Sequence, residues 1–354
     1  MRMSAACQLS GPAAACSLRA MTHRRLVTTT ICLAVLGAWP VAAHAKPHVT
    51  GSFRVPSGLS AGGSDQHGLV LGRDRALWMA TGTNPLAPKP KQPVLLRITS
   101  AGRMSAIKLP TPGGLGLSGL AVGPDGHIWF SGTAGAGTHR GYRGRVVGHR
   151  VKMKEASDSS SWSSLASIGH TAYLVDGFNG LSTSTDGETI TYAGALDNVS
   201  PWDIGVLGGK LALVGDGSGG LLSPGATAAT PFTVPAGADP VFSRSLTVAH
   251  GKVWFTEGSS NGATKHLGEV SPTGQVTYHA LPAPGLDVVT GPDGDPWVLS
   301  QRLLVHMTAA GKVKARVRLP GGQVGILESP GPKRTMWVAT SATGGSRLLR
   351  VAAR

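Results

Sequence analysis

The stretch Ser243–Pro282, SRSLTVAHGKVWFTEGSSNGATKHLGEVSPTGQVTYHALP, contains four short apolar runs separated by turns. We expect strands over 245–248, 253–256 and 267–270, and residues 275–281 alternate with the period of two typical of a half-buried strand. Tight turns over 250–252 and 271–274 separate these runs. Four short antiparallel strands in about 40 residues are typical of one blade of a β-propeller.

The same pattern recurs along the chain. A mostly aromatic second strand marks each of seven repeats, at 77–79, 128–130, 172–174, 211–213, 253–255, 296–298 and 336–338. Two repeats share the turn Gly-Pro-Asp-Gly, at 123–126 and 291–294, in which Pro pre-sets φ and Gly adopts a positive φ. Leu-Pro or Val-Pro ends several repeats, and Pro suits an outer edge because it donates no hydrogen bond. We therefore predict an all-β, seven-bladed β-propeller of four-stranded antiparallel blades; a six-bladed propeller is the alternative if the repeat around Ala212 is an irregular link.

The last repeat has too few strands after Trp337. Residues 48–56, HVTGSFRVP, resemble the final strand of other repeats. We expect this segment to pair beside residues 347–351 and to close the ring, which would remove the last open sheet edges.

The first 45 residues have the pattern of a secretory signal peptide. His23-Arg24-Arg25 is a positive segment, residues 26–38 are mostly apolar, and Ala43-His44-Ala45 is a small-x-small cleavage site. We expect a removed leader over 1–45, a single propeller domain over 46–354 without a transmembrane span, and a secreted, periplasmic or cell-envelope location. An uncleaved anchor is the alternative, although Pro40 and three threonines make a poor span. All three cysteines lie in the leader, so the exported chain depends on a large core rather than on disulfides.

The exported chain is basic. The leader holds four of the 33 Lys and Arg residues and no acid, which leaves 29 basic against 18 acidic residues and a net charge of +11. We expect a monomer whose partner is an extracytoplasmic protein, a peptide or an anionic polymer, and not nucleic acid. The densest positive stretch is an insertion over 135–154, and its Arg140, Arg143 and Arg145 are our predicted anion-binding residues. The alternatives are a solvated loop with an edge strand, and scattered charge that keeps the protein soluble.

The blade motifs GPDGHIWF (Gly123–Phe130), GKVWFTEG with GEVSPTG (Gly251–Gly274) and GPDGDPWV (Gly291–Val298) resemble the streptogramin B lyase (virginiamycin B lyase) family of seven-bladed propellers. The resemblance implies a C–O lyase that opens a cyclic depsipeptide by elimination with Mg²⁺, using histidines just before the first strand of adjacent blades and glutamates after Trp-Phe-Thr. His67 and Glu257 are the positions that match. The other blades depart from the histidine pattern, with Ser118, Ser163, Trp202, Arg244, Leu286 and Val324. The matching pair lies on blades one and five, too far around the ring for shared acid–base work, which requires hydrogen-bond reach.

Our preferred hypothesis is therefore an exported, non-catalytic propeller that acts as a binding or scaffold module for an extracytoplasmic partner or an anionic glycan. The predicted binding rim around the channel combines His67 and Glu257 with Trp202, Arg244, Asp176 and Asp216. The alternative is that Arg244 and Glu257 pair and Trp202 packs over the channel. We expect no cofactor and no metal site, because the scattered carboxylates are too few for a hard cation. A metal-dependent lyase with a rearranged site, His67 and Glu257 as its catalytic residues and Mg²⁺ as its cofactor, is the second hypothesis.

Overall fold

The computed structural model describes residues 46–61, 67–83, 92–110, 115–134, 140–156, 162–176, 180–215, 217–236, 245–259, 262–320, 324–341 and 345–353. These residues belong to one compact unit, His44–Arg354. The predicted leader lies outside the described residues, and its removal stays a prediction. Among the described residues there is no helix of the length and apolar character that a membrane span requires.

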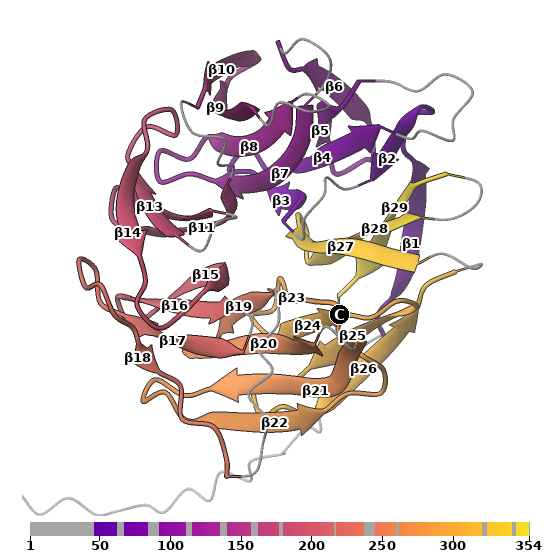
Figure 1. Ribbon diagram of the computed structural model, residues 1–354. Coiled ribbons are helices and arrows are strands. Elements are labelled where there is room, and N and C mark those ends of the chain that lie inside the picture. Colours follow the sequence, from indigo (N-terminus) through magenta and orange to yellow (C-terminus); the bar gives the residue numbers. More distant parts are fainter. Residues whose placement is uncertain are drawn as a thin grey trace, which may run out of the picture. The chain divides into compact units, whose positions relative to one another are not determined.

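Seven antiparallel sheets form a ring, and we number them blade 1 to blade 7 (Figure 1). Blade 1 contains β2 (Leu59–Ala61), β3 (Leu69–Leu71), β4 (Leu77–Thr83), β5 (Val94–Ile98) and β6 (Met104–Lys108); blade 2 contains β7 (Leu115–Val122), β8 (Ile128–Ala134), β9 (Arg140–Val147) and β10 (Arg150–Glu155); blade 3 contains β11 (Trp162–Ile168), β12 (Thr171–Asp176), β13 (Gly180–Ser184) and β14 (Thr191–Ala195). Blade 4 contains β15 (Pro201–Leu207), β16 (Lys210–Gly215), β17 (Ser218–Leu222) and β18 (Thr230–Pro231); blade 5 contains β19 (Leu246–Ala249), β20 (Lys252–Ser259), β21 (Gly262–Val270) and β22 (Val276–Ala280). Blade 6 contains β23 (Asp287–Thr290), β24 (Pro296–Leu299), β25 (Leu303–Met307) and β26 (Val313–Arg318); blade 7 contains β27 (Val324–Gly331), β28 (Thr335–Ser341), β29 (Arg347–Ala352) and β1 (His48–Arg54).

The predicted seven-bladed, all-β fold is confirmed, and the six-bladed alternative is wrong, because the repeat around Ala212 forms the complete blade 4. Six sheets have four strands, and in blade 1 the short strands β2 and β3 both pair with β4. The inner strands contact one another in an unbroken cycle, β3–β7–β11–β15–β19–β23–β27 and back to β3. The predicted insertion over 135–154 needs correction, since residues 140–155 are the third and outer strands of blade 2.

The hydrophobic core is divided among the blade junctions. Seven clusters of buried side chains occur, and each joins residues of two neighbouring blades. Trp129, Trp254, Trp297 and Trp337, on the second strands of their blades, have no exposed surface. The sheets are therefore held together by face-to-face packing of their second and third strands, which sequence periodicity had marked as apolar.

The repeated turn has a second function besides reversing the chain. Asp125 Oδ1 accepts hydrogen bonds from the His127 N–H (3.0 Å) and from the Trp129 indole (2.9 Å). Asp293 holds Trp297 in the same way, with 3.2 Å between Oδ1 and the indole nitrogen. A Cβ added at Gly123 would lie 2.3 Å from the Trp129 ring, so the first glycine of the motif leaves room for the indole. The Gly-Pro-Asp-Gly turn thus fixes the buried tryptophan as well as the chain direction.

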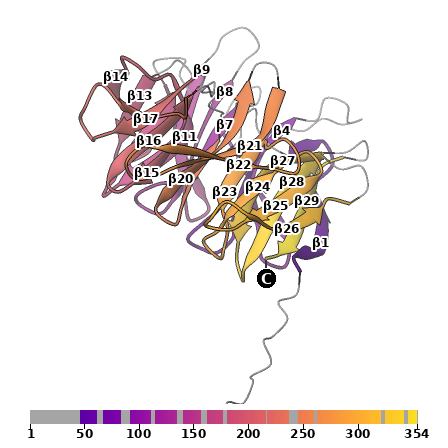
Figure 2. The same ribbon diagram turned by 90° about the horizontal axis from the view of Figure 1, so that it is seen from below.

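The two ends of the domain meet in blade 7. β1 pairs antiparallel with β29, with His48 opposite Ala352 and Arg54 opposite Arg347, as expected for this segment (Figure 2). Phe53 of β1 stacks on Trp337, with 5.4 Å between ring centroids. That this strand closes and stabilises the ring stays a prediction.

Candidate functional site

The inner strands enclose a cavity of about 350 Å³ on the ring axis. Residues from six blades line it, and most are aliphatic, such as Val70, Val122 and Val206. Its polar groups include His67, which precedes β3, Ser164 of β11 and Asp203 of β15. Mostly apolar walls with a few convergent polar groups are the usual makeup of a ligand pocket.

Asp203 joins four blades through this channel. The carboxylate is 1% exposed and accepts hydrogen bonds from Ser164 Oγ of blade 3 (2.5 Å) and from the Leu246 N–H of blade 5 (2.6 Å). Its own neighbour Ile204 donates at 2.7 Å, and His67 Nε2 of blade 1 lies 3.1 Å from Oδ1. So many donors stabilise a buried carboxylate, which would otherwise be strongly disfavoured.

A second buried carboxylate repeats this arrangement two blades further on. Asp287 of β23 accepts from Ser245 Oγ of blade 5 at 2.5 Å and from the Val288 N–H at 2.9 Å. Burial raises the pKa of Asp287, an effect that His67 opposes and the nearby Asp203 reinforces. The channel therefore brings together His67, Asp203 and Asp287, of which the sequence had indicated His67 alone.

Asp203 and Asp287 escaped the sequence analysis because they lie one residue after the position that we compared between blades. In blade 4 the ladder shifts between Pro201 and Asp203, so that Trp202 is the extra residue of a β-bulge. Bulges re-aim side chains and recur next to functional sites. The ladder of blade 7 shifts between Gly325 and Leu327, so the matching residue there is Ile326; our alignment of Val324 was wrong.

The two residues of the lyase hypothesis have separate partners. Glu257, at 6% exposure, accepts a hydrogen bond from Thr264 Oγ1 (2.7 Å) and lies 3.3 Å from His266 Nδ1, both in its own blade. His67 is held by Asp203 instead. The described contacts therefore give Glu257 and His67 no common site.

The structure describes only some of the remaining predicted rim and anion-binding residues. Trp202 is half-buried at the bulge of β15, and its carbonyl accepts a hydrogen bond from Ser163 Oγ at 3.2 Å. Arg244 and Asp216 lie outside the described residues, as do the side chains of Asp176 at the end of β12 and Arg140 at the start of β9. Their roles stay predictions.

Two of the three predicted anion-binding arginines of β9, Arg143 and Arg145, are described, and neither is a free surface cation. Arg145 Nη1 lies 2.8 Å from Asp125 Oδ2, and its Nε lies 3.3 Å from Glu188 of blade 3. Partial burial tends to raise the pKa of Asp125, but hydrogen bonds from the His127 N–H, Arg145 and the Trp129 indole outweigh it and lower the pKa. Arg143 is 8% exposed. The exposed cations of this stretch are instead Arg150, Lys152 and Lys154, at every second position of the outer strand β10.

The partner of Arg145 belongs to a repeated arrangement. The third-strand residue opposite the buried tryptophan is Arg97 in blade 1, Arg145 in blade 2 and His306 in blade 6. Each of these basic side chains contacts the aspartate in the turn before the second strand of its own blade, which is Asp74, Asp125 or Asp293. Blade 5 has no aspartate in this turn, and there the opposite residue is Glu269, paired with Lys252 at 2.6 Å. In each of these blades, therefore, the third-strand residue opposite the tryptophan contacts an acid–base partner at or just before the start of the second strand.

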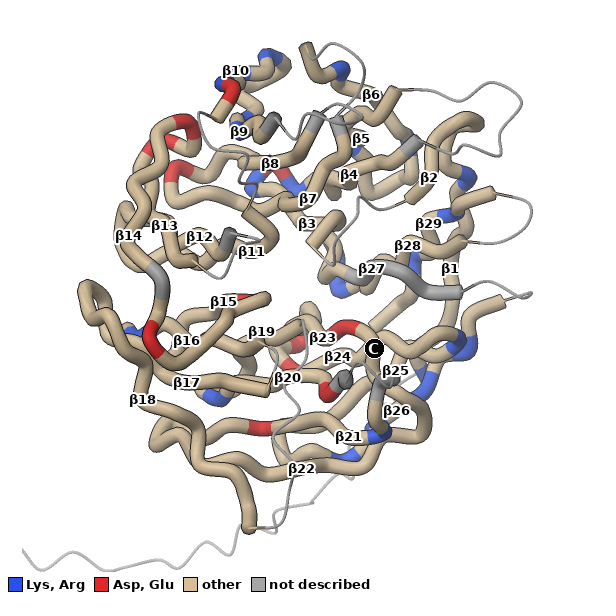
Figure 3. Tube along the Cα trace, viewed as in Figure 1, with Lys and Arg blue, Asp and Glu red and all other residues tan. Residues whose placement is uncertain are grey.

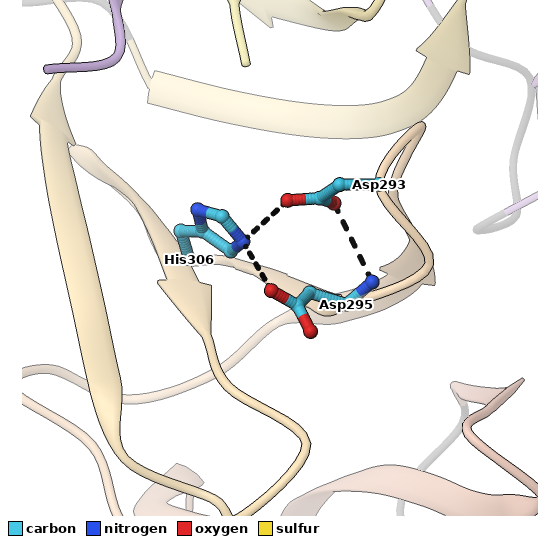
Figure 4. Close-up of side chains that lie close together, drawn as sticks. All are labelled: Asp293, Asp295 and His306. Atoms are coloured by element: carbon cyan, nitrogen blue, oxygen red, sulfur yellow. Dashed lines mark hydrogen bonds and ion pairs between the residues drawn. The ribbon is translucent and has the colours of Figure 1, made fainter. Parts of the chain in front are cut away.

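The same contact between a turn aspartate and a third-strand residue accounts for a cluster in blade 6 that resembles a metal site. Asp293, Asp295 and His306 bring their ligand atoms within 4.8 Å of one another (Figure 4). His306 Nε2 lies 2.8 Å from Asp293 and 3.0 Å from Asp295, and Lys314 Nζ also lies 3.0 Å from Asp295. Nδ1 of His306 is buried without a hydrogen-bond partner, which favours the tautomer with its proton on Nε2. His306 Nε2 then donates to both carboxylates, and Lys314 places a positive charge at Asp295, so these side chains already satisfy one another within blade 6.

A basic groove lies at the outer junction of blades 1 and 2. Its volume is about 650 Å³, and its basic lining residues are Arg97, Lys108, His149 and Arg150. Its floor is formed by aliphatic residues that include Ile107, and no carboxylate belongs to its lining. Lysine and arginine positions follow β6 and β10 at this edge of the ring (Figure 3).

Comparison with solved structures shows what fold this chain shares. A streptogramin B lyase structure matches with a TM-score of 0.67 at 15% identity, covering 87% of this chain and 98% of the other. Selenomethionine-substituted virginiamycin B lyase from Staphylococcus aureus matches with a TM-score of 0.63 at 15% identity, covering 83% and 98%. The WD40 propeller domain of Doa1 matches with a TM-score of 0.57 at 13% identity, covering 86% and 98%.

The extracellular domain of a one-component system from B. thetaiotaomicron matches with a TM-score of 0.61 at 12% identity, covering 84% of this chain and 39% of the other. No family model matches the sequence, and no curated protein matches it. Because these identities are low and the matched proteins differ in kind, the likeness concerns the backbone alone. The chain has the seven-bladed propeller fold that streptogramin B lyase shares with extracellular domains and WD40 scaffolds.

Proposed function

We propose that this protein is an exported, non-catalytic binding module, that its partner is an anionic glycan or related acidic polymer outside the cytoplasm, and that the groove between blades 1 and 2 binds it. The module acts as a monomer and without a cofactor. The proposal rests on one observation, the groove lined by four basic residues and no acidic one. The metal-dependent lyase alternative has no comparable support, because His67 and Glu257 have separate partners.

Several features of the groove suit a polyanion. Lys108 and Arg150 are exposed, and neither has an ion pair or side-chain hydrogen bond within the described ranges. Lys152 and Lys154 continue the positive charge along β10. A row of cations on the last strand of a sheet also discourages edge-to-edge aggregation, so the experiment has to separate a binding role from a protective one.

The test is binding of the purified protein to dextran sulfate, with uncharged dextran as the ligand control. We expect saturable binding that weakens as salt rises, because exposed charges are screened over about 10 Å at 0.1 M ionic strength. The double variant Lys108→Glu, Arg150→Glu should lose most of this binding. Lys210→Glu with Lys312→Glu makes the same change in net charge at exposed positions outside the groove and should lose much less. Equal losses in both double variants would show that only the overall charge matters and would refute the groove.

Export is tested separately, since the leader lies outside the described residues. Expression of the full chain in a secreting host should yield a protein that begins at Lys46, as read by N-terminal sequencing. Recovery of the intact chain from the cytoplasm would contradict this part of the proposal.

A further inference from the structure

A separate pocket of about 380 Å³ lies at the turn between β24 and β25, against the segment that leads into β23. One side of it is apolar and includes Pro284, Leu286 and Leu303. The other side is formed by the turn, which contributes Ser300 and Arg302.

Ser300 carries a hydroxyl group without a partner. The residue is 2% exposed, and its backbone N–H donates to the Leu303 carbonyl at 2.8 Å, which closes the turn. Ser300 belongs to the pocket lining, and its buried Oγ has no hydrogen-bond partner in the described part of the protein. Buried hydroxyls are nearly always hydrogen-bonded, because an unsatisfied one destabilises the fold. A buried, unpaired hydroxyl in a pocket wall therefore points to a ligand.

Arg302 contributes a second donor to the lining of the same pocket. Its carbonyl accepts a hydrogen bond from the Leu319 N–H at 3.0 Å, which anchors the backbone of the turn. The side chain is exposed, and no ion pair or hydrogen bond holds its guanidinium among the described residues. Arg318, opposite Leu303 in the ladder, is a further exposed cation, and no acidic residue lines the pocket. The lining of the pocket thus offers hydrogen-bond donors and positive charge without a carboxylate.

We propose that this pocket binds a carboxylate that carries a compact apolar group. The carboxylate accepts hydrogen bonds from Ser300 Oγ and from the Arg302 guanidinium, whose planar fork matches the geometry of a carboxylate. The apolar group packs against Pro284 and Leu286. Both a free monocarboxylate and the C-terminus of a peptide have this chemistry. The inference does not depend on the basic groove, which lies on other blades.

The test is calorimetric titration of the purified protein with N-acetyl-leucine, with the neutral N-acetyl-leucinamide as matched control. We expect saturable binding of the acid and at least tenfold weaker binding of the amide, since an ionic hydrogen bond is lost. Hexanoate identifies the source: equal or tighter binding of hexanoate supports a free monocarboxylate, and tighter binding of N-acetyl-leucine supports a peptide terminus.

Ser300→Ala and Arg302→Gln should each weaken binding of the acid about tenfold. Arg316→Gln, an exposed change on β26 outside the pocket lining, should leave it unchanged. Ser300→Ala should not lower the melting temperature, because it removes a hydroxyl that has no partner. Equal binding of acid and amide, an unaffected Arg302→Gln variant, no binding up to roughly 10 mM ligand, or a marked stability loss in Ser300→Ala would each overturn the proposal.

Discussion

Replacing Asp203 by Ala should destabilise the whole ring rather than one blade. The substitution removes the acceptor of two buried donors from other blades, Ser164 Oγ and the Leu246 N–H. A buried donor without a partner costs about 1–3 kcal/mol, so the two together would cost about 2–6 kcal/mol. The variant no longer buries a carboxylate charge, and the desolvation cost that it avoids offsets part of this loss. We therefore expect a net destabilisation of about 3 kcal/mol.

Thermal and urea unfolding of the purified protein measure this change. A loss of about 3 kcal/mol corresponds to a fall in Tm of roughly 4–6 °C for a domain of about 300 residues, because the unfolding entropy is about 2.1 cal/mol/K per residue. Asp203→Asn keeps one acceptor oxygen and should lose about half as much. Ser164→Ala leaves the carboxylate with its other donors and should cost only about 1 kcal/mol. An Asp203→Ala variant that melts with the parent protein would refute the reasoning that this carboxylate joins the blades.

The other predictions concern the blade edges and the turn ion pairs. Deleting residues 46–54 should lower the calorimetric midpoint of the whole domain, because β29 loses its outer partner; an unchanged midpoint would contradict ring closure by this strand. Asp125→Ala should destabilise the protein by about 2 kcal/mol in urea, since the His127 N–H and the Trp129 indole lose their acceptor and Arg145 keeps only Glu188 among its described partners, while an equally stable variant would show that this contact is dispensable. Burial lowers the pKa of His306 below its usual 6.5, so the unfolded chain binds this proton first and stability should fall as pH drops from 7 to about 5. His306→Gln should show a smaller fall over that range, and an identical pH profile would assign the effect to other groups.

The fold was predictable because its signals are local. The Gly-Pro-Asp-Gly turns, the buried tryptophans and the Leu-Pro strand ends repeat at nearly constant spacing, so that a blade can be read from about 40 residues. The roles of Arg145 and His306 could not be read in this way. They depend on strand register, which decides the third-strand residue that lies opposite the tryptophan of the second strand. Strand register is fixed by turn length and by the buried face, and an error of one residue exchanges the two faces of a strand.

The candidate sites were harder to predict for the same reason. Asp203 and Asp287 follow the compared position by one residue, so an alignment of that single position passes over both of them. A comparison of both positions in every blade would have found the two aspartates beside the serines. The Ser300 pocket leaves no such signal in the sequence. Its hydroxyl is notable because no other described segment supplies a hydrogen-bond partner, and only the folded structure shows this.

The pairing of β1 with β29 also bears on how the protein is made. Thr50 Oγ1 donates to the carbonyl of Arg350, a residue 300 positions later in the chain. The ribosome releases β1 long before β29, which is the strand partner of β1 among the described residues. Contacts between such distant segments slow folding, and β1 exposes an unpaired backbone while it waits. Blade 7 therefore cannot form until β29 has emerged, and a holding chaperone on the N-terminal segment would act during that interval.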